Sequence, residues 1–351
     1  MNEKIVNKIK NNVNSIAEKV LKKQLNINKN LKQNYNEYHK KKCLEDIKYH
    51  LNYLTEALAN SEKDIFSDYA LWAKILLNKL GIATETLIEN FNIINAVLSN
   101  EYSLKKNSKA VEYINYAINI LVKEEEKVKS FITDKNPLKE EASKYLEFIL
   151  NAKKDKAVNL IMKIAKESTP VREIYLNIFQ PVQHEIGRLW HTNKISVGQE
   201  HYSTAVTQLV MSRLYSFILN SDNTKNKTMI AASIGEELHE IGIRMVADFF
   251  EMDGWNTYFY GANTPNKTII NSIQKVNADI IALSVTIAYH LSELKKLISQ
   301  IRENKKTKNI KIIVGGYIFN KTPGLWKKVG ADGYAENAQK AIKTVDKLLR
   351  E

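Results

Sequence analysis

The sequence predicts an α plus α/β protein, in which two helical blocks precede one parallel β-sheet. Apolar residues recur at helical spacing, with few glycines or prolines, over about the first 220 residues. Beyond them, short apolar runs alternate with amphipathic stretches, which is the pattern of successive strand and helix units in a parallel sheet. The chain has 351 residues, of which 44% are hydrophobic, so it is long enough for two or three domains with sizeable cores.

The first block, residues 1–137, is predicted to be a helical bundle. From Asn2 to Ser130 it contains one glycine, Gly81, and no proline. A clear amphipathic helix begins near Cys43, and a second runs from Phe66 to Leu80.

The net charge of +13 is concentrated near the start of the chain, because residues 1–50 hold twelve lysines and five acidic residues. Such a segment can contact nucleic-acid phosphates. However, its lysines are interleaved with asparagine and isoleucine, and no helix-turn-helix or stacking pattern accompanies them. We therefore favour a solvated helix face and predict no clear nucleic-acid module. The single cysteine, Cys43, excludes an intrachain disulfide and a cysteine metal cluster. No apolar stretch is long enough for a membrane span and the N-terminus is charged, so a cytoplasmic protein is expected.

The second block, residues 138–221, is again predicted to be helical and follows a polar linker from Thr133 to Pro137. Pro170 and Pro181 are expected to start or interrupt helices. Beyond them a tryptophan and a histidine are followed, after a short interval, by a Glu-His pair. These residues are Trp190, His191, Glu200 and His201. Trp190 would also serve as a core anchor, and a histidine at that position as a surface residue.

The third block, residues 222–351, is predicted to form a flavodoxin-like, five-stranded parallel sheet with helices between the strands. The predicted strands are Thr228–Ser233, Asn256–Tyr260, Asp279–Ser284, Lys311–Val314 and a short piece near Gly333. The stretch from Gly261 to Pro265 is expected to be the turn after the second strand, with Pro265 at an early helical position. A last helix, from Asn337 to Leu349, closes the sheet.

A histidine follows the first predicted strand. Glu237, His239 and Gly242 are spaced as Glu-x-His-x-x-Gly. Loops at the carboxyl ends of parallel strands line the ligand crevice, and a neutral imidazole is the commonest ligand of transition metals. Glu237 can accept a hydrogen bond from one ring nitrogen, which fixes the tautomer and raises the basicity of the ligand. Taken alone, a loop histidine is more often a capping or loop-stabilising residue.

Two further motifs end later strands. Ser284 and Thr286 offer small hydroxyl groups after the third strand. Gly315 and Gly316 end the fourth strand, where the missing Cβ atoms let a flat ligand lie against the backbone. A pair of glycines is also compatible with an ordinary tight turn. Tyr334 lies in the last strand-like piece, before the final helix.

These motifs, in this order on alternating strands and helices, resemble the cobalamin-binding domain of methionine synthases, corrinoid methyltransferase proteins and B12-dependent light sensors. In that family a histidine replaces the lower dimethylbenzimidazole ligand of cobalt, and the displaced nucleotide enters a deep pocket beside the sheet. The resemblance implies that His239 is the lower cobalt ligand. It also implies that the other motif residues bind the cofactor, namely Glu237, Gly242, Ser284, Thr286, Gly315, Gly316 and Tyr334.

The spacing of tryptophan and Glu-His in the second block is similar to that of the B12-dependent photoreceptors that repress carotenoid synthesis. In those proteins a four-helix cap covers the upper face of the corrin. The resemblance implies that Trp190 covers the upper axial group and that Glu200 and His201 line a pocket for the 5′-deoxyadenosyl group of adenosylcobalamin. It further implies that His191 binds cobalt from above once light has broken the cobalt–carbon bond.

The aromatic residues of the first block give a third resemblance. The runs from Asp46 to Leu54 and from Phe66 to Trp72 look like the helical region of stand-alone B12 sensors, including the photocobilins, which bind a linear tetrapyrrole beside cobalamin. The resemblance implies a pocket for a bilin such as biliverdin, formed by His50, Tyr53, Tyr69 and Trp72. Such residues on one helix face are also typical of a hydrophobic core, and Cys43 is poorly suited to covalent attachment of a chromophore.

Two classes of function follow from these patterns. The favoured one is a sensory protein without enzymatic activity, which binds adenosylcobalamin, alone or with a bilin, and changes its cap on illumination. Its output would need a homo-oligomer or a protein partner. The alternative is a corrinoid protein that carries a methyl group between two methyltransferases. A methyl carrier must open its upper face and has no need of the Trp-His and Glu-His pairs together. A weaker third hypothesis makes the first block a DNA-binding or partner-binding module.

Overall fold

The computed structural model describes residues 2–28, 36–102, 104–105, 108–124, 128–218 and 225–350. The chain divides into two compact units, residues 1–126 and residues 127–351. The predicted boundary between the second and third blocks, at residues 221 and 222, lies outside the described residues. Within the described ranges, no helix combines the length and the apolar character needed to cross a lipid bilayer.

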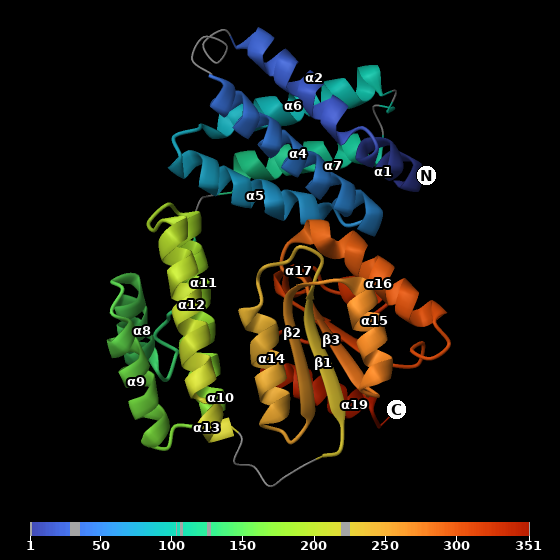
Figure 1. Ribbon diagram of the computed structural model, residues 1–351. Coiled ribbons are helices and arrows are strands. Elements are labelled where there is room, and N and C mark those ends of the chain that lie inside the picture. Colours follow the sequence, from blue (N-terminus) through green and yellow to red (C-terminus); the bar gives the residue numbers. More distant parts are fainter. Residues whose placement is uncertain are drawn as a thin grey trace. The chain divides into compact units, whose positions relative to one another are not determined.

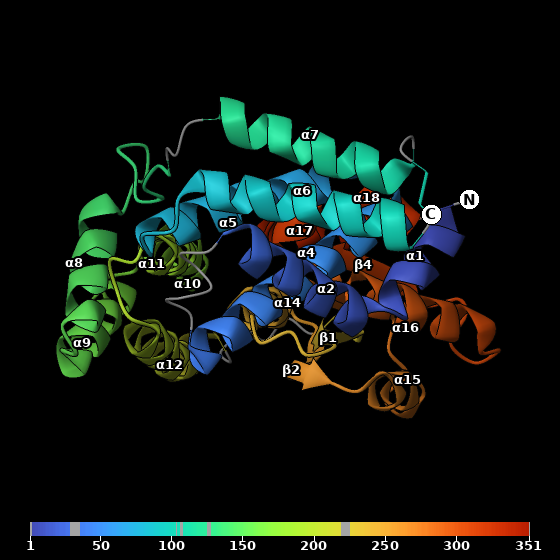
Figure 2. The same ribbon diagram turned by 90° about the horizontal axis from the view of Figure 1, so that it is seen from above.

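The first unit is helical throughout its described part (Figure 1). Its helices are α1 (Asn2–Lys10), α2 (Val13–Ile27), α4 (Glu37–Asn60), α5 (Lys63–Lys79), α6 (Thr84–Glu101) and α7 (Lys109–Lys123). Helices α6 and α7 run side by side, as Figure 2 shows. Helix α4 begins before the predicted start near Cys43, because the side chain of Asn36 caps it by accepting the N–H of His39. The apolar stripes of α4 and α5 form the core, where Leu51, Leu58 and Phe66 are fully buried.

A four-helix bundle opens the second unit (Figure 1). Its helices are α8 (Lys139–Leu150), α9 (Lys154–Lys166), α10 (Val171–Ile174), α11 (Gln180–His191) and α12 (Val197–Arg213), with a short α13 (Tyr215–Ile218) after them. A π-helical turn, Tyr175–Phe179, joins α10 to α11, so these two make one continuous helical run. Pro181 lies in the first turn of α11, as predicted, and Ser196 begins α12 with a capping box to Gln199.

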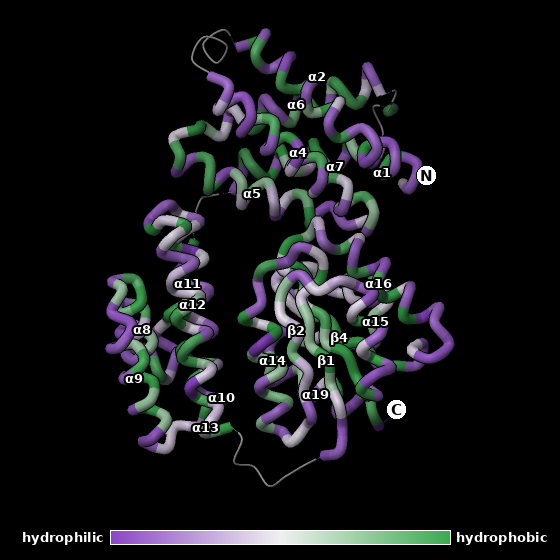
Figure 3. Tube along the Cα trace, viewed as in Figure 1, coloured by the Kyte–Doolittle hydropathy of each residue, from purple (hydrophilic) through white to green (hydrophobic). Residues whose placement is uncertain are grey.

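The sheet of the second unit has five parallel strands in the order β2-β1-β3-β4-β5. Its strands are β1 (Thr228–Ile234), β2 (Asn256–Thr264), β3 (Ile280–Ser284), β4 (Lys311–Gly315) and β5 (Gly333–Tyr334). The helices between and after them are α14 (Ile241–Glu251), α15 (Asn266–Lys275), α16 (Leu291–Glu303), α17 (Tyr317–Lys321), α18 (Leu325–Lys328) and α19 (Ala338–Leu348). This is the predicted flavodoxin-like arrangement, in which the interior strands β3 and β4 are among the green segments of Figure 3.

The direction of the strand order reverses at β1, since β2 lies on one side of it and β3 on the other. The loops that leave the carboxyl ends of β1 and β3 therefore diverge. Such a switch point is where open parallel sheets bind ligands. The fold alone thus directs attention to the loops after these two strands.

The end of β2 differs from the prediction. Gly261 to Pro265 was expected to be a turn, but the strand continues to Thr264, with its register against β1 shifted near Ala232. Gly261 has a φ of +68°, which lets the strand bend without ending. Pro265 is the N-cap of α15 and lies just outside the helix, whereas it was expected at an early helical position.

Candidate functional site

The loop between β1 and α14 carries a tightly bonded Glu–His pair. Glu237 is fully buried, and its Oε1 accepts hydrogen bonds from Nδ1 of His239 at 2.5 Å and from the backbone N–H of the same residue at 3.1 Å. The side chain of His239 is 61% exposed. Because Nδ1 is engaged by the carboxylate, Nε2 is the ring nitrogen that remains for a metal.

The second oxygen of Glu237 connects this loop to the loop after β3. Oε2 accepts the backbone N–H groups of Thr286 at 2.8 Å and Ile287 at 3.0 Å. Burial alone would raise the pKa of Glu237, but the hydrogen bonds from His239 and from these two N–H groups bring it below its ordinary value. The hydrogen bond to Glu237 raises the pKa of His239 in turn. The two loops at the switch point are therefore joined through one ionised carboxylate.

The predicted residues after β3 and β4 lie at the same end of the sheet. Ser284 is buried and pairs with Ser233 on one side and Gly315 on the other. Thr286 contributes its backbone N–H to Glu237, a role that the sequence did not predict. A cofactor contact through the two hydroxyl groups stays a prediction.

The two glycines after β4 have a structural cause of their own. Gly316 has a φ of +105°, and a Cβ there would lie 2.2 Å from the carbonyl oxygen of Val285. At Gly315 a Cβ would lie 3.0 Å from the carbonyl oxygen of Ala335. The packing of the protein itself therefore requires Gly316 and leaves little room for a side chain at Gly315, whereas the sequence predicts room there for a nucleotide. Their contact with a nucleotide stays a prediction.

Two other residues of the predicted cofactor site are Gly242 and Tyr334. Packing does not require a glycine at position 242, and Tyr334 is hydrogen-bonded within the protein. A Cβ at Gly242, in the first turn of α14, would meet nothing within 4 Å. The hydroxyl of Tyr334 donates to Oδ1 of Asn320 at 2.7 Å, and partial burial raises the pKa of Tyr334.

The cap residues divide between two helices. Trp190 and the buried His191 end α11, and Glu200 and His201 lie in the first turn of α12. Oε2 of Glu200 is 2.5 Å from Nδ1 of His201, and the negative charge of Glu200 contributes to the raised pKa of His239. A role for His191 as an upper ligand stays a prediction.

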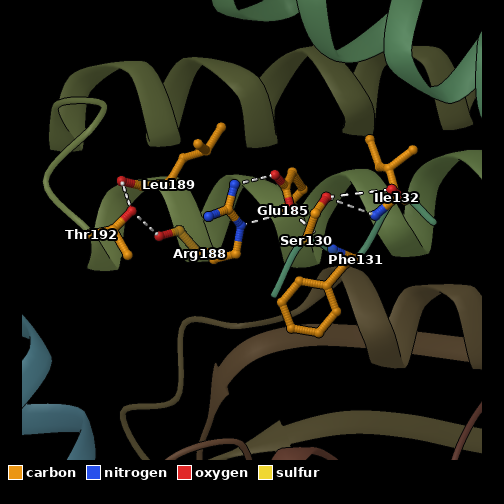
Figure 4. A network of polar contacts seen from close by, with 7 residues as sticks. All are labelled: Ser130, Phe131, Ile132, Glu185, Arg188, Leu189 and Thr192. Atoms are coloured by element: carbon orange, nitrogen blue, oxygen red, sulfur yellow. Dashed lines mark hydrogen bonds and ion pairs between the residues drawn. The ribbon is translucent and has the colours of Figure 1, made fainter. Parts of the chain in front are cut away.

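A network of polar contacts fixes the helix that ends in Trp190 and His191 (Figure 4). Arg188 donates to both carboxylate oxygens of Glu185, at 2.9 and 2.5 Å. Oε2 of Glu185 also accepts the backbone N–H of Phe131, at 3.0 Å. Burial opposes ionisation of Glu185, but these contacts lower its pKa overall. The segment before the cap is thereby fastened to α11.

A polar seam, which the sequence analysis missed, joins the cap to α14. Its members are Gln208, Ser212 and Tyr215 on the cap side and Glu240, Arg244 and Asp248 on α14 or at its N-cap. Asp248 is buried, and its two oxygens accept the hydroxyl groups of Tyr175 and Tyr215, each at 2.7 Å. Burial raises the pKa of Asp248, and the two hydroxyl donors oppose that rise. The available sequence pattern was the helical spacing of these residues, four and four on the α14 side and four and three on the cap side.

The four residues of the predicted bilin pocket do lie together in the first unit. His50 is buried and its Nδ1 is 2.8 Å from the hydroxyl of Tyr69. The rings of Tyr53 and Tyr69 stack with centroids 3.8 Å apart, and Trp72 follows at 6.3 Å from Tyr69. Burial lowers the pKa of His50 to about 3, so its imidazole is neutral at physiological pH. The cluster also touches Phe91 in the core, so the core interpretation applies at least to its buried end.

The histidine site suits a flat cofactor that carries its own metal ligands. Within the described ranges, no group of three or more His, Cys, Asp or Glu residues could hold a metal ion. His239 thus offers a single imidazole. The second unit also exposes large apolar side chains. Leu238 precedes His239 in sequence, and Val197 and Tyr317 are the first residues of α12 and α17.

Comparison with known proteins accounts for nearly all of the chain. The B12 binding domain model matches residues 227–343, and a second B12 binding domain model matches residues 142–215. The phycobilisome protein model matches residues 2–121.

Among the relatives is dimethylamine corrinoid protein 1 of Methanosarcina mazei, which is 26% identical over 219 residues. The alignment covers 62% of this chain and 99% of the relative. A corrinoid protein of Desulfitobacterium hafniense is 26% identical over 130 residues, which are 37% of this chain and 59% of that protein.

A solved structure shares the fold. The Methanosarcina barkeri monomethylamine corrinoid protein aligns with a TM-score of 0.52 and 20% identity, over 59% of this chain and 97% of that one. The second unit therefore comprises B12-binding domains, a helical cap and a Rossmann-like cobalamin domain, and its cofactor is a cobalamin or another corrinoid.

Proposed function

Because the second unit carries B12-binding domains, we propose that the protein binds a corrinoid with Nε2 of His239 as the lower cobalt ligand. The observation that carries this proposal is the contact between buried Glu237 and Nδ1 of His239 at the switch point of the sheet. It holds the imidazole in the tautomer that a metal requires and increases its basicity. The other oxygen of Glu237 accepts two backbone N–H groups of the loop after β3, so the carboxylate that orients His239 is itself fixed.

Methyl carriage is the output that the relatives support. Two of the named relatives, dimethylamine corrinoid protein 1 and the monomethylamine corrinoid protein, align over 99% and 97% of their own length. A bound corrinoid supplies a cobalt that accepts a methyl group and gives it up. In this function His239 holds the cofactor from below, and the cap must uncover the upper face to let two methyltransferases reach it in turn.

Light sensing with adenosylcobalamin is the second candidate, and two observations favour it. The cap contains Trp190, His191, Glu200 and His201 at a sequence spacing that resembles that of the B12-dependent photoreceptors. The first unit matches the phycobilisome protein model and brings the predicted bilin residues into one cluster. In this function a protein partner or a homo-oligomer reads the change of the cap.

The shared proposal is tested by spectroscopy on His239→Ala. Wild-type protein mixed with hydroxocobalamin should give the spectrum of a histidine-ligated corrinoid, and His239→Ala should lose that spectrum and most of the affinity. Glu237→Gln should weaken binding about tenfold or more, because it removes the charge that orients the imidazole. The control is His39→Ala, a change of an exposed histidine in the first unit. An unchanged spectrum and affinity in His239→Ala would refute the assignment.

One comparison separates the two outputs. Protein loaded with adenosylcobalamin is illuminated with green light, and protein loaded with methylcobalamin is offered a thiol acceptor and a methyltransferase. An irreversible spectral shift that is altered in His191→Ala supports the sensor. Methyl transfer without a light response of the cap supports the carrier.

A further inference from the structure

Glu240, the residue directly after His239, contacts the cap and the sheet at the same time. It is the N-cap residue of α14, and its carbonyl accepts the N–H of Arg244 at 2.9 Å. Its two carboxylate oxygens are used separately. Oε1 faces helix α12 of the cap and Oε2 faces the end of β2.

On the cap side, the contact is reinforced one helical turn further along α14. Nε2 of Gln208 donates to Oε1 of Glu240 at 2.6 Å. The backbone carbonyl of Gln208 accepts a hydrogen bond from Arg244 at 3.3 Å, and Arg244 also donates to Oγ of Ser212 at 2.8 Å. Both the side-chain amide and the backbone carbonyl of Gln208 are therefore hydrogen-bonded to residues at the start of α14, which fixes the position of α12 along α14.

On the sheet side, the end of β2 is shaped around the carboxylate. Oε2 of Glu240 accepts the backbone N–H of Ala262 at 2.8 Å. A Cβ at Gly261 would lie 2.7 Å from the same oxygen, and the φ of +68° at Gly261 turns the strand towards it. The bend in β2 therefore leaves the space that Glu240 fills.

We propose that Glu240 is a positioning residue that couples the cap to the cobalt-ligating histidine. The carboxylate of Glu240 connects α12 to β2, and Glu240 is the residue next to His239 in the chain. A displacement of the cap at Gln208 therefore also displaces the loop that carries His239. The proposal rests on His239 being the lower ligand, as proposed above. It explains how a change at the upper face reaches the lower ligand without passing through the corrin.

The coupling is tested first in the protein without cofactor. Glu240→Ala should speed hydrogen exchange at the amide of Ala262 about tenfold, because that N–H loses a charged acceptor. Exchange in α12 around Gln208 should rise as well. The matched control is Glu236→Ala, which removes the same charge from an exposed position of the same loop. Exchange equal to wild type in Glu240→Ala would overturn the coupling.

A conservative variant distinguishes positioning from general instability. In Glu240→Gln the amide oxygen can still accept the N–H of Ala262, and the amide nitrogen can donate to Gln208 once that side chain turns its own amide over. We therefore expect Glu240→Gln to restore most of the protection lost in Glu240→Ala. Failure to restore it, with both variants folded, would contradict a geometric role.

The second measurement uses hydroxocobalamin. Glu240→Ala should bind it about tenfold more weakly than wild type and show a smaller histidine-ligated fraction, while Glu236→Ala should match wild type. If wild type and Glu240→Ala have the same affinity and the same histidine-ligated spectrum, the inference fails and the proposed function stands. If wild type shows no histidine-ligated spectrum, the proposed function fails, while the exchange experiment still decides whether Glu240 couples α12 to β2.

Discussion

Asp46 is a single carboxyl group whose surroundings oppose its charge. It lies on α4, partly buried, next to Glu45 and close enough to the Tyr69 side of the aromatic cluster to affect the hydroxyl there. Burial and the charge of Glu45 raise the pKa of Asp46 to about 6, against the opposing effect of Lys42. The folded state therefore holds a proton on Asp46 at pH values where the unfolded chain has lost it, and stability falls as the pH rises through this window.

Replacing Asp46 with asparagine should stabilise the first unit above pH 6. The expected gain is about 1–2 kcal/mol at pH 7.5, reduced from the full linkage value because the side chain is partly exposed. The gain should shrink as the pH falls from 6 to about 4 and vanish at lower pH, where Asp46 is protonated in both the folded and the unfolded state. Native-state hydrogen exchange in α4 and α5 of the full chain measures it. Glu45→Gln is the control, because the hydrogen bond to Lys42 lowers the pKa of Glu45 and its charge is favoured in the folded state. A gain that grows at low pH would contradict the argument.

Residues of the site differ in how far they could be predicted. The Glu237–His239 contact follows from local spacing, because a carboxylate two residues away can reach the imidazole. Glu240 could not be found this way, since its partners Gln208 and Ala262 are 32 and 22 positions distant and neither belongs to a motif. Resemblance directed attention to ligand-binding residues and away from those that hold the scaffold.

Glycine positions at the ends of elements report on packing between strands and loops. Gly316 begins α17 in a backbone conformation that side chains rarely adopt, with the backbone of Val285 directly against it. Gly242, in the first turn of α14, has open space around it. Both are members of the same family motif set, yet only one is required by the fold.

Alanine at these two positions should therefore have opposite effects on the protein without cofactor. Gly316→Ala should destabilise the second unit by about 3 kcal/mol or more, because its Cβ would overlap a backbone carbonyl. Gly242→Ala should be neutral or stabilise by up to about 1 kcal/mol, since alanine is the better helix former. Urea denaturation of both variants checks this. A loss of cobalamin affinity in a stable Gly242→Ala would assign that glycine to the ligand, whereas equal destabilisation of both variants would contradict the packing argument.

At the level of elements, the helices and the alternation of strands with helices were predictable from periodicity, whereas the flavodoxin-like arrangement of the sheet came with the resemblance, and the boundaries were less predictable. Strands β1, β3 and β4 are short apolar runs, and the sequence located them to within one residue at each end. The end of β2 was missed because Gly261 and Pro265 are ordinary turn residues, and only the tertiary fit of Glu240 against the bend explains why the strand continues. The start of α4 was missed because its first turns are polar and exposed.

The whole chain joins a helical first unit to a second unit that carries the B12-binding domains. The dimethylamine corrinoid relative aligns with 62% of the chain, so methyl carriage by itself leaves the first unit without a role. That unit brings His50, Tyr53, Tyr69 and Trp72 together, as predicted, although their spacing in sequence did not show which of them would be buried. Trp72 is 38% exposed, whereas His50 is buried.

Co-expression with a biliverdin-producing enzyme tests the function of this unit in the full chain. If the cluster binds a bilin, the purified protein should gain a far-red absorption band in addition to the cobalamin bands. Trp72→Ala should reduce the band by removing the exposed aromatic ring, and Trp326→Phe, on α18 of the other unit, should not. Absence of the band in wild type would assign the cluster to the hydrophobic core.

Glu237 also determines how the cofactor is received. All four of its hydrogen bonds come from groups of the protein itself, so the orientation of the His239 ring needs no contact with a ligand. Under the proposed function, folding would thus order both loops once, and binding of a corrinoid would not have to order them again. Preorganisation of this kind predicts a rigid receptor, in which the rate of cofactor capture is set by how often the cap opens and not by rearrangement of the histidine.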